Sequence, residues 1–252
     1  MKVDYHIHSE YSYDSKIKAK DVIDQAISMH YNAIAITEHL DLLPQELGIF
    51  GLPSLKHYRD SMTDLQDNYP EFKILCGIEI GDYHRVKDFA RALIAPFAFD
   101  LILGSVHFLT DNTNVAIPFT APLGKSAQID YYEQNLSLVT DCEIDVLAHL
   151  GVYKRYYTEA PDESHCRHIV EAIFRTMIKR EIALEVNFSS LRKRFPFVLP
   201  EPHYLDLYRN LGGRLFSIGS DSHRLDHFDD HYHRLPKWLL NANNLSGNLI
   251  LV

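Results

Sequence analysis

The stretch KVDYHIH at residues 2–8 decides how the rest of the sequence is interpreted. Its apolar and polar residues alternate, and this pattern predicts a β-strand. Residues two apart on a strand project from the same face, so His6 and His8 are expected to point together and could bind one metal ion. An isolated HxH pair is weak evidence, because two hydrogen-bonded structural histidines give the same pattern.

Six further strand-like runs follow, most of them continuously apolar, as in parallel strands covered on both faces; they span residues 33–37, 72–80, 100–108, 144–149, 182–187 and 214–221. The segments between them carry helical spacing, as at 19–30 and 168–179. This alternation predicts seven successive βα units. It favours a closed or nearly closed barrel over an open doubly wound sheet, although closure itself is not encoded in the pattern.

Composition narrows the class of protein. The chain has 252 residues, 46% of them apolar, with 25 basic and 34 acidic side chains and a formal charge of −9. Collagen, coiled coils and disorder are excluded, and tight binding to long nucleic acids is disfavoured. The three cysteines are scattered, which favours a reducing compartment, and the cytoplasm is expected. No apolar run is long enough for a membrane helix, so no membrane partner is expected. We expect a single domain over residues 1–252.

Fifteen histidines are unusual for this length. Nine lie in polar or helix-like contexts and are expected to have ordinary surface roles: His30, His57, His84, His165, His168, His203, His227, His231 and His233. The other six, with three carboxylates, lie at the carboxyl ends of predicted strands: His6, His8, Glu38, His39, Glu79, His107, His149, Asp221 and His223. The catalytic residues of barrel enzymes lie at these strand ends, so a single metal cluster explains these nine positions better than unrelated structural roles do.

The ligand types indicate which metals are suitable. Imidazole and carboxylate without thiolate suit Zn, Mn or Fe(II) and disfavour a structural cysteine-type zinc site. Glu79 lies inside the apolar run GIEI, where burial of an unpaired carboxylate is costly, so a cation is expected beside it.

Seven short motifs in order carry a family resemblance: DYHIHSEYSYD (4–14), AITEH (35–39), GIEI (77–80), GSVH (104–107), LAHL (147–150), EVNFSSLRK (185–193) and GSDSH (219–223). Each motif is weak alone, but the ordered set is specific. The sequence resembles the polymerase and histidinol phosphatase (PHP) superfamily, and within it the histidinol-phosphate phosphatases. The resemblance implies a distorted TIM-like (β/α)7 barrel, with a trinuclear metal centre in a cleft at its carboxyl-terminal face.

The resemblance also implies how the ligands are shared among three divalent ions. One ion would take His6, His8, Glu79 and Asp221, a second would share Glu79 and add His107 and His149, and a third would take Asp14, His39 and His223. Some relatives carry histidine in place of Asp14. Glu38 stands where many relatives have Asp, and it could support the metal ligands without binding metal itself.

Two cations bridged by Glu79 and a water would lower the pKa of that water and present hydroxide to phosphorus. Arg155 and Arg192 occupy the places of phosphate-binding arginines in related enzymes, and an ordinary solvated arginine is the alternative at each position. The residues expected to be catalytic are therefore Glu79, Asp221, His223, Arg155 and Arg192. The general acid for the leaving group is unassigned.

The sequence thus predicts a metal-dependent phosphomonoesterase that hydrolyses L-histidinol phosphate to L-histidinol and phosphate in histidine biosynthesis. The alternative is a PHP-type phosphoesterase acting on nucleotides, nucleic-acid ends or protein phosphotyrosine. An amidohydrolase is disfavoured, because that class typically uses a lysine-derived bridge, and a metal-storing module would not need open coordination positions. The native metal and the oligomeric state stay open.

Several conspicuous residues near the expected barrel mouth are interpreted as structural. Five tyrosines, Tyr5, Tyr11, Tyr13, Tyr156 and Tyr157, are expected to serve mainly in packing. The acidic, histidine-rich run at 224–234 is interpreted as a solvated loop or helix start.

Overall fold

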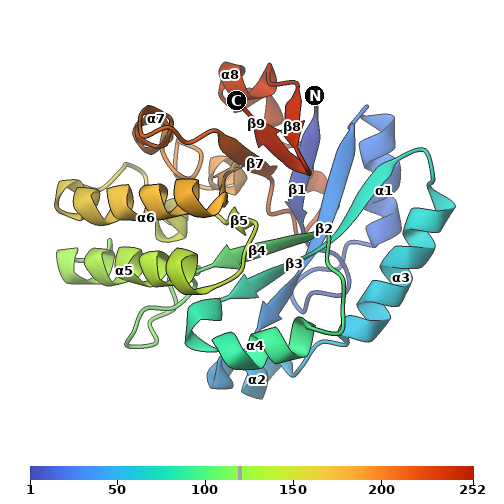
Figure 1. Cartoon of the computed structure of the whole chain (residues 1–252), viewed down its shortest axis with the longest axis horizontal. Coiled ribbons are helices and arrows are strands. Elements are labelled where there is room, and N and C mark those ends of the chain that lie inside the picture. The colour runs from blue at the N-terminus through green and yellow to red at the C-terminus, as the bar shows by residue number, and fades with distance from the viewer. Residues whose placement is uncertain (119–120) are drawn as a thin grey trace.

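A parallel sheet forms the centre of the molecule (Figure 1), seen in a computed structural model that describes residues 1–118 and 121–252. Its strands lie side by side in sequence order: β1 (Val3–Ile7), β2 (Ala33–Asp41), β3 (Lys73–Gly81), β4 (Leu101–Ser105), β5 (Val146–Leu147), β6 (Ala183–Asn187) and β7 (Leu215–Gly219). All seven predicted strands are present. An antiparallel hairpin that the sequence analysis missed, β8 (Asn244–Ser246) and β9 (Leu249–Leu251), extends the sheet beyond β7.

The contacts between β1 and β7, the first and last parallel strands, show how far the sheet closes on itself. The His6 carbonyl accepts a hydrogen bond from the Asp221 amide at 2.8 Å, and the His8 amide donates to the Ser222 carbonyl at 2.9 Å. One isolated parallel bridge, between Ile7 and Ser222, joins the two edges here, whereas β9 pairs with the beginning of β7. The edges therefore meet at the carboxyl ends of the strands without a continuous ladder. This is the predicted distorted (β/α)7 barrel.

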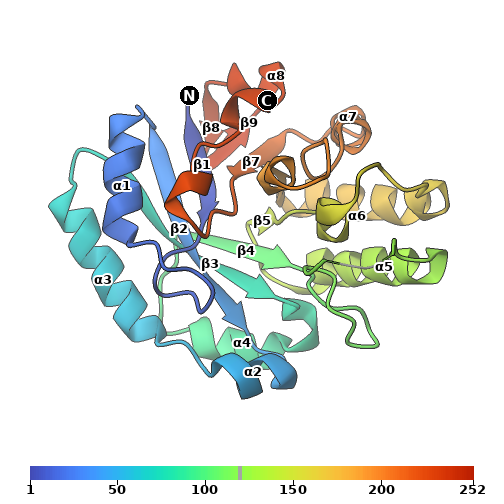
Figure 2. The same ribbon diagram turned by 180° about the vertical axis from the view of Figure 1, so that it is seen from behind.

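Helices pack around the outside of the strands (Figures 1 and 2): α1 (Ala19–Ser28), α2 (Pro44–Phe50), α3 (Leu55–Asn68), α4 (Lys87–Ile94), α5 (Lys125–Asp141), α6 (Arg167–Arg180), α7 (Pro202–Asn210) and α8 (Lys237–Leu240). The predicted helices at 19–30 and 168–179 correspond to α1 and α6. Their apolar faces are buried, as at Val22 and Ile23 on α1 and at Ile173 and Phe174 on α6, because the helices cover the sheet and exclude water from it.

Short 3-10 helices lie in the connections that follow the strands: η1 (Tyr83–Arg85), η2 (Val152–Tyr156), η3 (Ser164–Cys166), η4 (Ser189–Arg192), η5 (Leu225–His227) and η6 (Tyr232–Arg234). Figure 2 shows the molecule from behind, with α1 and α3 on the side of β1 to β3 and with α5 and α6 on the opposite side. Within residues 1–118 and 121–252, no helix is both long and apolar enough to cross a membrane.

Four strand ends differ from the prediction by two residues or more. β4 ends at Ser105 and β7 at Gly219, so His107 and Asp221 lie just after these strands and not within them. β2 continues to Asp41, because its ladder with β3 runs on to the pair Asp41 and Gly81, so Glu38 and His39 lie within the strand and not after it. β5 is only two residues long, and the chain leaves the sheet before His149, which has a φ of 25°. The side chains at these positions still reach the same end of the barrel.

Candidate metal centre

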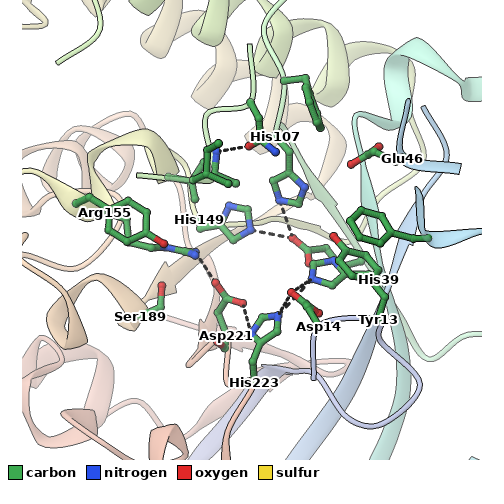
Figure 3. A pocket seen from close by; sticks show the side chains of 18 of the residues that line it. Tyr13, Asp14, His39, Glu46, His107, His149, Arg155, Ser189, Asp221 and His223 are labelled. Atoms are coloured by element: carbon green, nitrogen blue, oxygen red, sulfur yellow. Dashed lines mark hydrogen bonds and ion pairs between the residues drawn. The ribbon is translucent and has the colours of Figure 1, made fainter. Parts of the chain in front are cut away.

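A cavity of about 610 Å³ opens at the carboxyl ends of the strands (Figure 3). Seven of the predicted metal ligands line it: Asp14, His39, Glu79, His107, His149, Asp221 and His223. The remaining two, His6 and His8, are completely buried beneath it on β1 and just after it. The structure therefore brings all nine predicted ligands, from segments far apart in sequence, to one place.

His6 and His8 form the deepest part of the cluster. Their Nε2 atoms are 3.0 Å apart, as expected for two side chains on the same face of a strand. The same two atoms lie 3.3 and 3.4 Å from Glu79 Oε2, and the His8 Nε2 atom lies 3.5 Å from Asp221 Oδ1. Two imidazoles and two carboxylates thus converge on a small volume.

Glu79 lies at the centre and has a second set of neighbours. Its Oε1 atom lies 2.8 Å from His149 Nε2 and 3.6 Å from His107 Nε2. The Oε2 atom lies 3.1 Å from His39 Nδ1. The two oxygens of one carboxylate therefore face different histidines, which is the arrangement a bridging ligand requires.

A third group lies toward the open side of the cavity. The Nε2 atoms of His39 and His223 are 3.3 Å apart, and Asp14 Oδ2 lies 3.1 Å from the latter and 3.7 Å from the former. The Asp14 side chain is 40% exposed, in contrast to Glu79 and Asp221.

This donor set fits divalent cations. Three groups of nitrogen and carboxylate oxygen atoms each lie within 4.8 Å of one another: His6, His8 and Asp221; His6, Glu79 and His149; His8, His39 and His223. Among the described residues, the buried Glu79 Oε2 atom has no hydrogen-bond partner. Imidazole nitrogens that face one another repel through their lone pairs unless a proton or a cation lies between them. Nitrogen and oxygen donors without sulfur suit Zn, Mn or Fe(II).

The electrostatics of the cluster favour positive charge. Burial opposes ionisation of Glu79, but the charge of His6, the hydrogen bond with His149 and the nearby His39 outweigh it and hold the Glu79 pKa well below its usual range. Burial alone would lower the pKa of His107, but the nearby carboxylates of Asp41 and Glu79 outweigh it and raise that pKa to about 9. The carboxylates thus remain charged and attract cations.

Glu185 on β6 is a supporting residue that the sequence analysis missed. It is completely buried, and its Oε1 atom accepts a hydrogen bond from His6 Nδ1 at 2.7 Å, which turns His6 Nε2 toward the cavity. Gly219 makes room for it, because a Cβ atom there would collide with the Glu185 carboxylate and lie 2.6 Å from His6 Cβ. The sequence does indicate this position, because Glu185 is a charged residue inside the apolar run at 182–187.

Glu38 supports the loop that follows β1. Its carboxylate accepts hydrogen bonds from the Ser9 amide at 3.0 Å and from the hydroxyls of Ser9 and Ser12, and it is buried away from the cavity. The Ser12 hydroxyl also accepts a hydrogen bond from the His39 amide at 3.0 Å. Glu38 therefore acts on the cluster indirectly, through the backbone around His39.

One wall of the cavity is basic. Arg155, on η2, makes an ion pair with Asp221 Oδ2, and its side chain is 13% exposed. Arg192, on η4, donates to the Ser220 carbonyl at 2.6 Å. Lys193 lines the same cavity. Both predicted arginines therefore border the predicted metal ligands.

Other lining residues were not assigned to the site from sequence. Tyr13, Tyr156 and His227 line the cavity, although the sequence analysis expected packing or surface roles for them. Glu46, on α2, also lines it and was not singled out. Burial, followed by the charge of Asp41, raises the pKa of Glu46 to about 7. These residues lie on loops and short helices, where no strand periodicity marks them.

Fold and site together define a class: a distorted (β/α)7 barrel with a histidine- and carboxylate-lined cavity suited to several divalent ions, bordered by arginines. The PHP domain family matches residues 4–189, and the chain belongs to this family. Within it, the chain belongs with the histidinol-phosphate phosphatases, as the resemblance implied.

Relatives cover nearly the whole chain. A "Probable histidinol-phosphatase" of Clostridium acetobutylicum is 29% identical over 250 residues, covering 96% of this chain and 94% of the relative. A "Histidinol-phosphatase" of Lactococcus lactis is 30% identical over 235 residues, covering 88% of this chain and 84% of the relative.

Two solved structures share the fold. The histidinol phosphate phosphatase of Lactococcus lactis, complexed with zinc, L-histidinol and phosphate, superimposes with a TM-score of 0.75 at 28% identity and covers 89% of this chain and 87% of that one. A putative histidinol phosphatase of Listeria monocytogenes has a TM-score of 0.80 at 18% identity, with 93% and 100% covered, and shows the fold alone.

Proposed function

We propose that this protein is a metal-dependent phosphomonoesterase that hydrolyses L-histidinol phosphate to L-histidinol and phosphate, a reaction of histidine biosynthesis. The observation that carries the proposal is the convergence of six histidines and three carboxylates in and directly beneath one cavity, beside two arginines. The Lactococcus lactis relative, with zinc, L-histidinol and phosphate bound, supports the same reaction.

The proposed ligands hold three divalent ions per chain. His6, His8, Glu79 and Asp221 would hold one ion, Glu79 with His107 and His149 a second, and Asp14, His39 and His223 a third. Zinc is favoured by the Lactococcus lactis relative, and manganese and iron suit the same donors. Ions bound here supply Lewis-acid polarisation of the phosphoryl group and a nucleophile generated from water at neutral pH.

The side chains of the basic wall act on the phosphate. Arg155 and Arg192 present planar, permanently charged groups that pair with phosphate oxygens and stabilise the charge that develops on them in the transition state. Asp221 links this wall to the metal centre, because its Oδ1 atom faces the histidines while its Oδ2 atom holds Arg155. Loss of Asp221 would therefore disturb both the ions and the phosphate position.

The remaining expectations complete the proposal. Residues 1–252 act as one domain, the substrate is a small phosphomonoester, and the protein works in the cytoplasm. Long nucleic acids are poor substrates, because the basic residues at the cavity are few and the chain carries a net charge of −9.

A phosphate-release screen tests the proposal. The metal-loaded protein is assayed with L-histidinol phosphate, phosphotyrosine, nucleotides and short 5′-phosphorylated oligonucleotides. We expect kcat/KM for L-histidinol phosphate to exceed that for every other compound. Equal turnover of all small phosphates, or a preference for a nucleotide, would contradict the proposed substrate and favour another phosphoesterase of the same family.

A further inference from the structure

The two ends of the cavity carry opposite charge. Figure 3 shows Arg155 and Ser189 on one side and Glu46 on the other, with His107 and His149 between them. Arg192 and Lys193 add positive charge to the arginine side. A bound molecule that reaches from one side to the other would therefore meet cations at one end and a carboxylate at the opposite end.

Glu46 is an unusual residue for a cavity wall. Its side chain is only 5% exposed, and in the part of the chain that the structure describes it forms no ion pair with a lysine or an arginine. Its one hydrogen bond is a long one, 3.4 Å, from the Leu43 amide at the start of α2. His107 supplies positive charge nearby, but burial outweighs it, so a cation that arrives with the substrate would relieve the remaining cost of burying this carboxylate.

The surroundings of Glu46 suit the organic part of a substrate. Ile49 and Phe50 of α2 line the same cavity, as do Phe108 and Ile117 from the loop after β4. The Phe50 ring stacks on Tyr13 with ring centroids 3.7 Å apart, which holds an apolar surface at the cavity mouth. A leaving group with an apolar part and a positive end could pack against these apolar side chains and pair with Glu46.

We propose that Glu46 determines specificity by binding the positively charged end of the leaving group while the arginine side holds the phosphate. This inference rests on the proposed function and deepens it, because L-histidinol carries an amine and an imidazole, both of which can be cationic. A charge-assisted hydrogen bond in a shielded site would make the cavity select phosphomonoesters of cationic alcohols over neutral ones.

The decisive variant is Glu46→Gln, which keeps the shape and the acceptor for the Leu43 amide but removes the charge. We expect its KM for L-histidinol phosphate to rise about 10-fold to 100-fold. Turnover of phenyl phosphate, which has a neutral leaving group, should change less than twofold. The inhibition constant of L-histidinol should rise with KM, whereas that of inorganic phosphate should stay the same.

Two further substrates identify the cation that Glu46 binds. Ethanolamine phosphate has an amine without a ring, and 3-(imidazol-4-yl)propyl phosphate has the ring without an amine. A weaker reaction of Glu46→Gln with the first assigns the contact to the ammonium group, and with the second to the imidazolium. Glu133→Gln is the matched control, because it removes the same charge at an exposed position of α5 outside the cavity; it should leave the substrate preference unchanged.

The failures of the two proposals are distinguishable. If the wild-type protein does not hydrolyse L-histidinol phosphate, the proposed function is wrong. If the wild-type protein hydrolyses it and Glu46→Gln keeps the same KM, or loses phenyl phosphate turnover equally, the role of Glu46 is overturned. Should Glu46→Gln fold poorly by circular dichroism, Glu46→Asp decides, because a retained charge should keep most of the preference.

Discussion

Two clusters of buried charge lie side by side in this molecule and are built in opposite ways. The candidate metal centre leaves Glu79 Oε2 without a hydrogen-bond partner among the described residues and turns imidazole nitrogens toward one another. The second, here called the lysine cluster, consists of Lys154, Glu163, Glu201, Tyr132 and Tyr204. Lys154 belongs to η2, the same short helix that carries Arg155 into the cavity.

The lysine cluster contains its own counter-charges. Lys154 Nζ is completely buried and donates to Glu201 at 2.6 Å and to Glu163 at 2.9 Å. The hydroxyls of Tyr132 and Tyr204 each donate to Glu163 at 3.0 Å. A buried charge with internal partners serves stability and position, whereas a buried charge that lacks a cation serves binding. The following changes test this contrast.

The largest effect is expected from Glu79→Gln. The amide keeps the size of the side chain but removes the charge that two predicted ions share, so kcat should fall by about a thousandfold or more, equivalent to about 4 kcal/mol. Phosphate release from L-histidinol phosphate measures this, with circular dichroism to check the fold. Glu133→Gln, at an exposed position of α5, is the control and should keep full activity. An active Glu79→Gln variant would show that Glu79 does not bridge ions.

Lys154→Met should act on stability instead. Removal of the lysine leaves the buried carboxylate of Glu201 without a counter-charge, at a cost of about 3 to 5 kcal/mol in the free energy of unfolding. Urea denaturation measures it. Lys56→Met is the control, because the exposed pair of Lys56 and Asp60 should contribute less than about 1 kcal/mol.

The double variant Lys154→Met with Glu201→Gln should recover part of the lost stability, since one stranded charge is removed with its partner. If Lys154→Met lowers kcat while the free energy of unfolding is unchanged, the lysine cluster is part of the catalytic site and the contrast between the two clusters is wrong.

The same contrast explains what the sequence could reveal. Strand alternation placed His6, His8 and Glu79 at one end of a barrel, because side chains of parallel strands keep a fixed direction and register. The structure brings these groups together. A charged residue inside an apolar strand indicates a position in or beside the site. Glu79 shows this pattern, and Glu185 shows it as well.

Residues on loops were harder to find. Glu46 and His227 line the cavity from α2 and η5, where the chain path depends on tertiary packing and no short repeat reports it. Lys154 gave no signal either, because its partners Glu163 and Glu201 follow 9 and 47 residues later in the chain. The hairpin of β8 and β9 was missed because its strands are only three residues each.

Removal of metal should lower the stability of the protein through the candidate metal centre and should leave the lysine cluster unaffected. An ion present at about 100 times its dissociation constant stabilises the folded state by about 2.7 kcal/mol, so a chelator should lower Tm by about 5 to 10 °C in this size range. Differential scanning fluorimetry with and without zinc or manganese measures the shift.

The variants sharpen this test. Lys154→Met should keep the metal-dependent shift in Tm, although it starts from a lower Tm. Glu79→Gln should lose most of the shift. An equal shift in both variants would place the bound ions outside the proposed centre.

The smallest effect concerns the pH dependence of the lysine cluster, which has two carboxylates for one lysine. Burial, followed by the charge of Glu201, raises the pKa of Glu163 to about 8. In the unfolded chain the pKa of a glutamate is about 4.3. The folded state therefore binds this proton more tightly, and its contribution to stability is complete below the unfolded pKa and is lost as the pH rises through the folded pKa.

Glu163→Gln isolates this contribution, because all other titrating groups are common to both proteins. The amide cannot titrate, so from pH 6 to pH 8 the wild-type protein should lose about 2 kcal/mol of unfolding free energy relative to the variant, at up to about 1.4 kcal/mol per pH unit. Urea denaturation at several pH values measures the difference. Parallel curves for the two proteins would mean that Glu163 stays ionised beside Lys154, and that the lysine cluster carries a net negative charge in the folded protein.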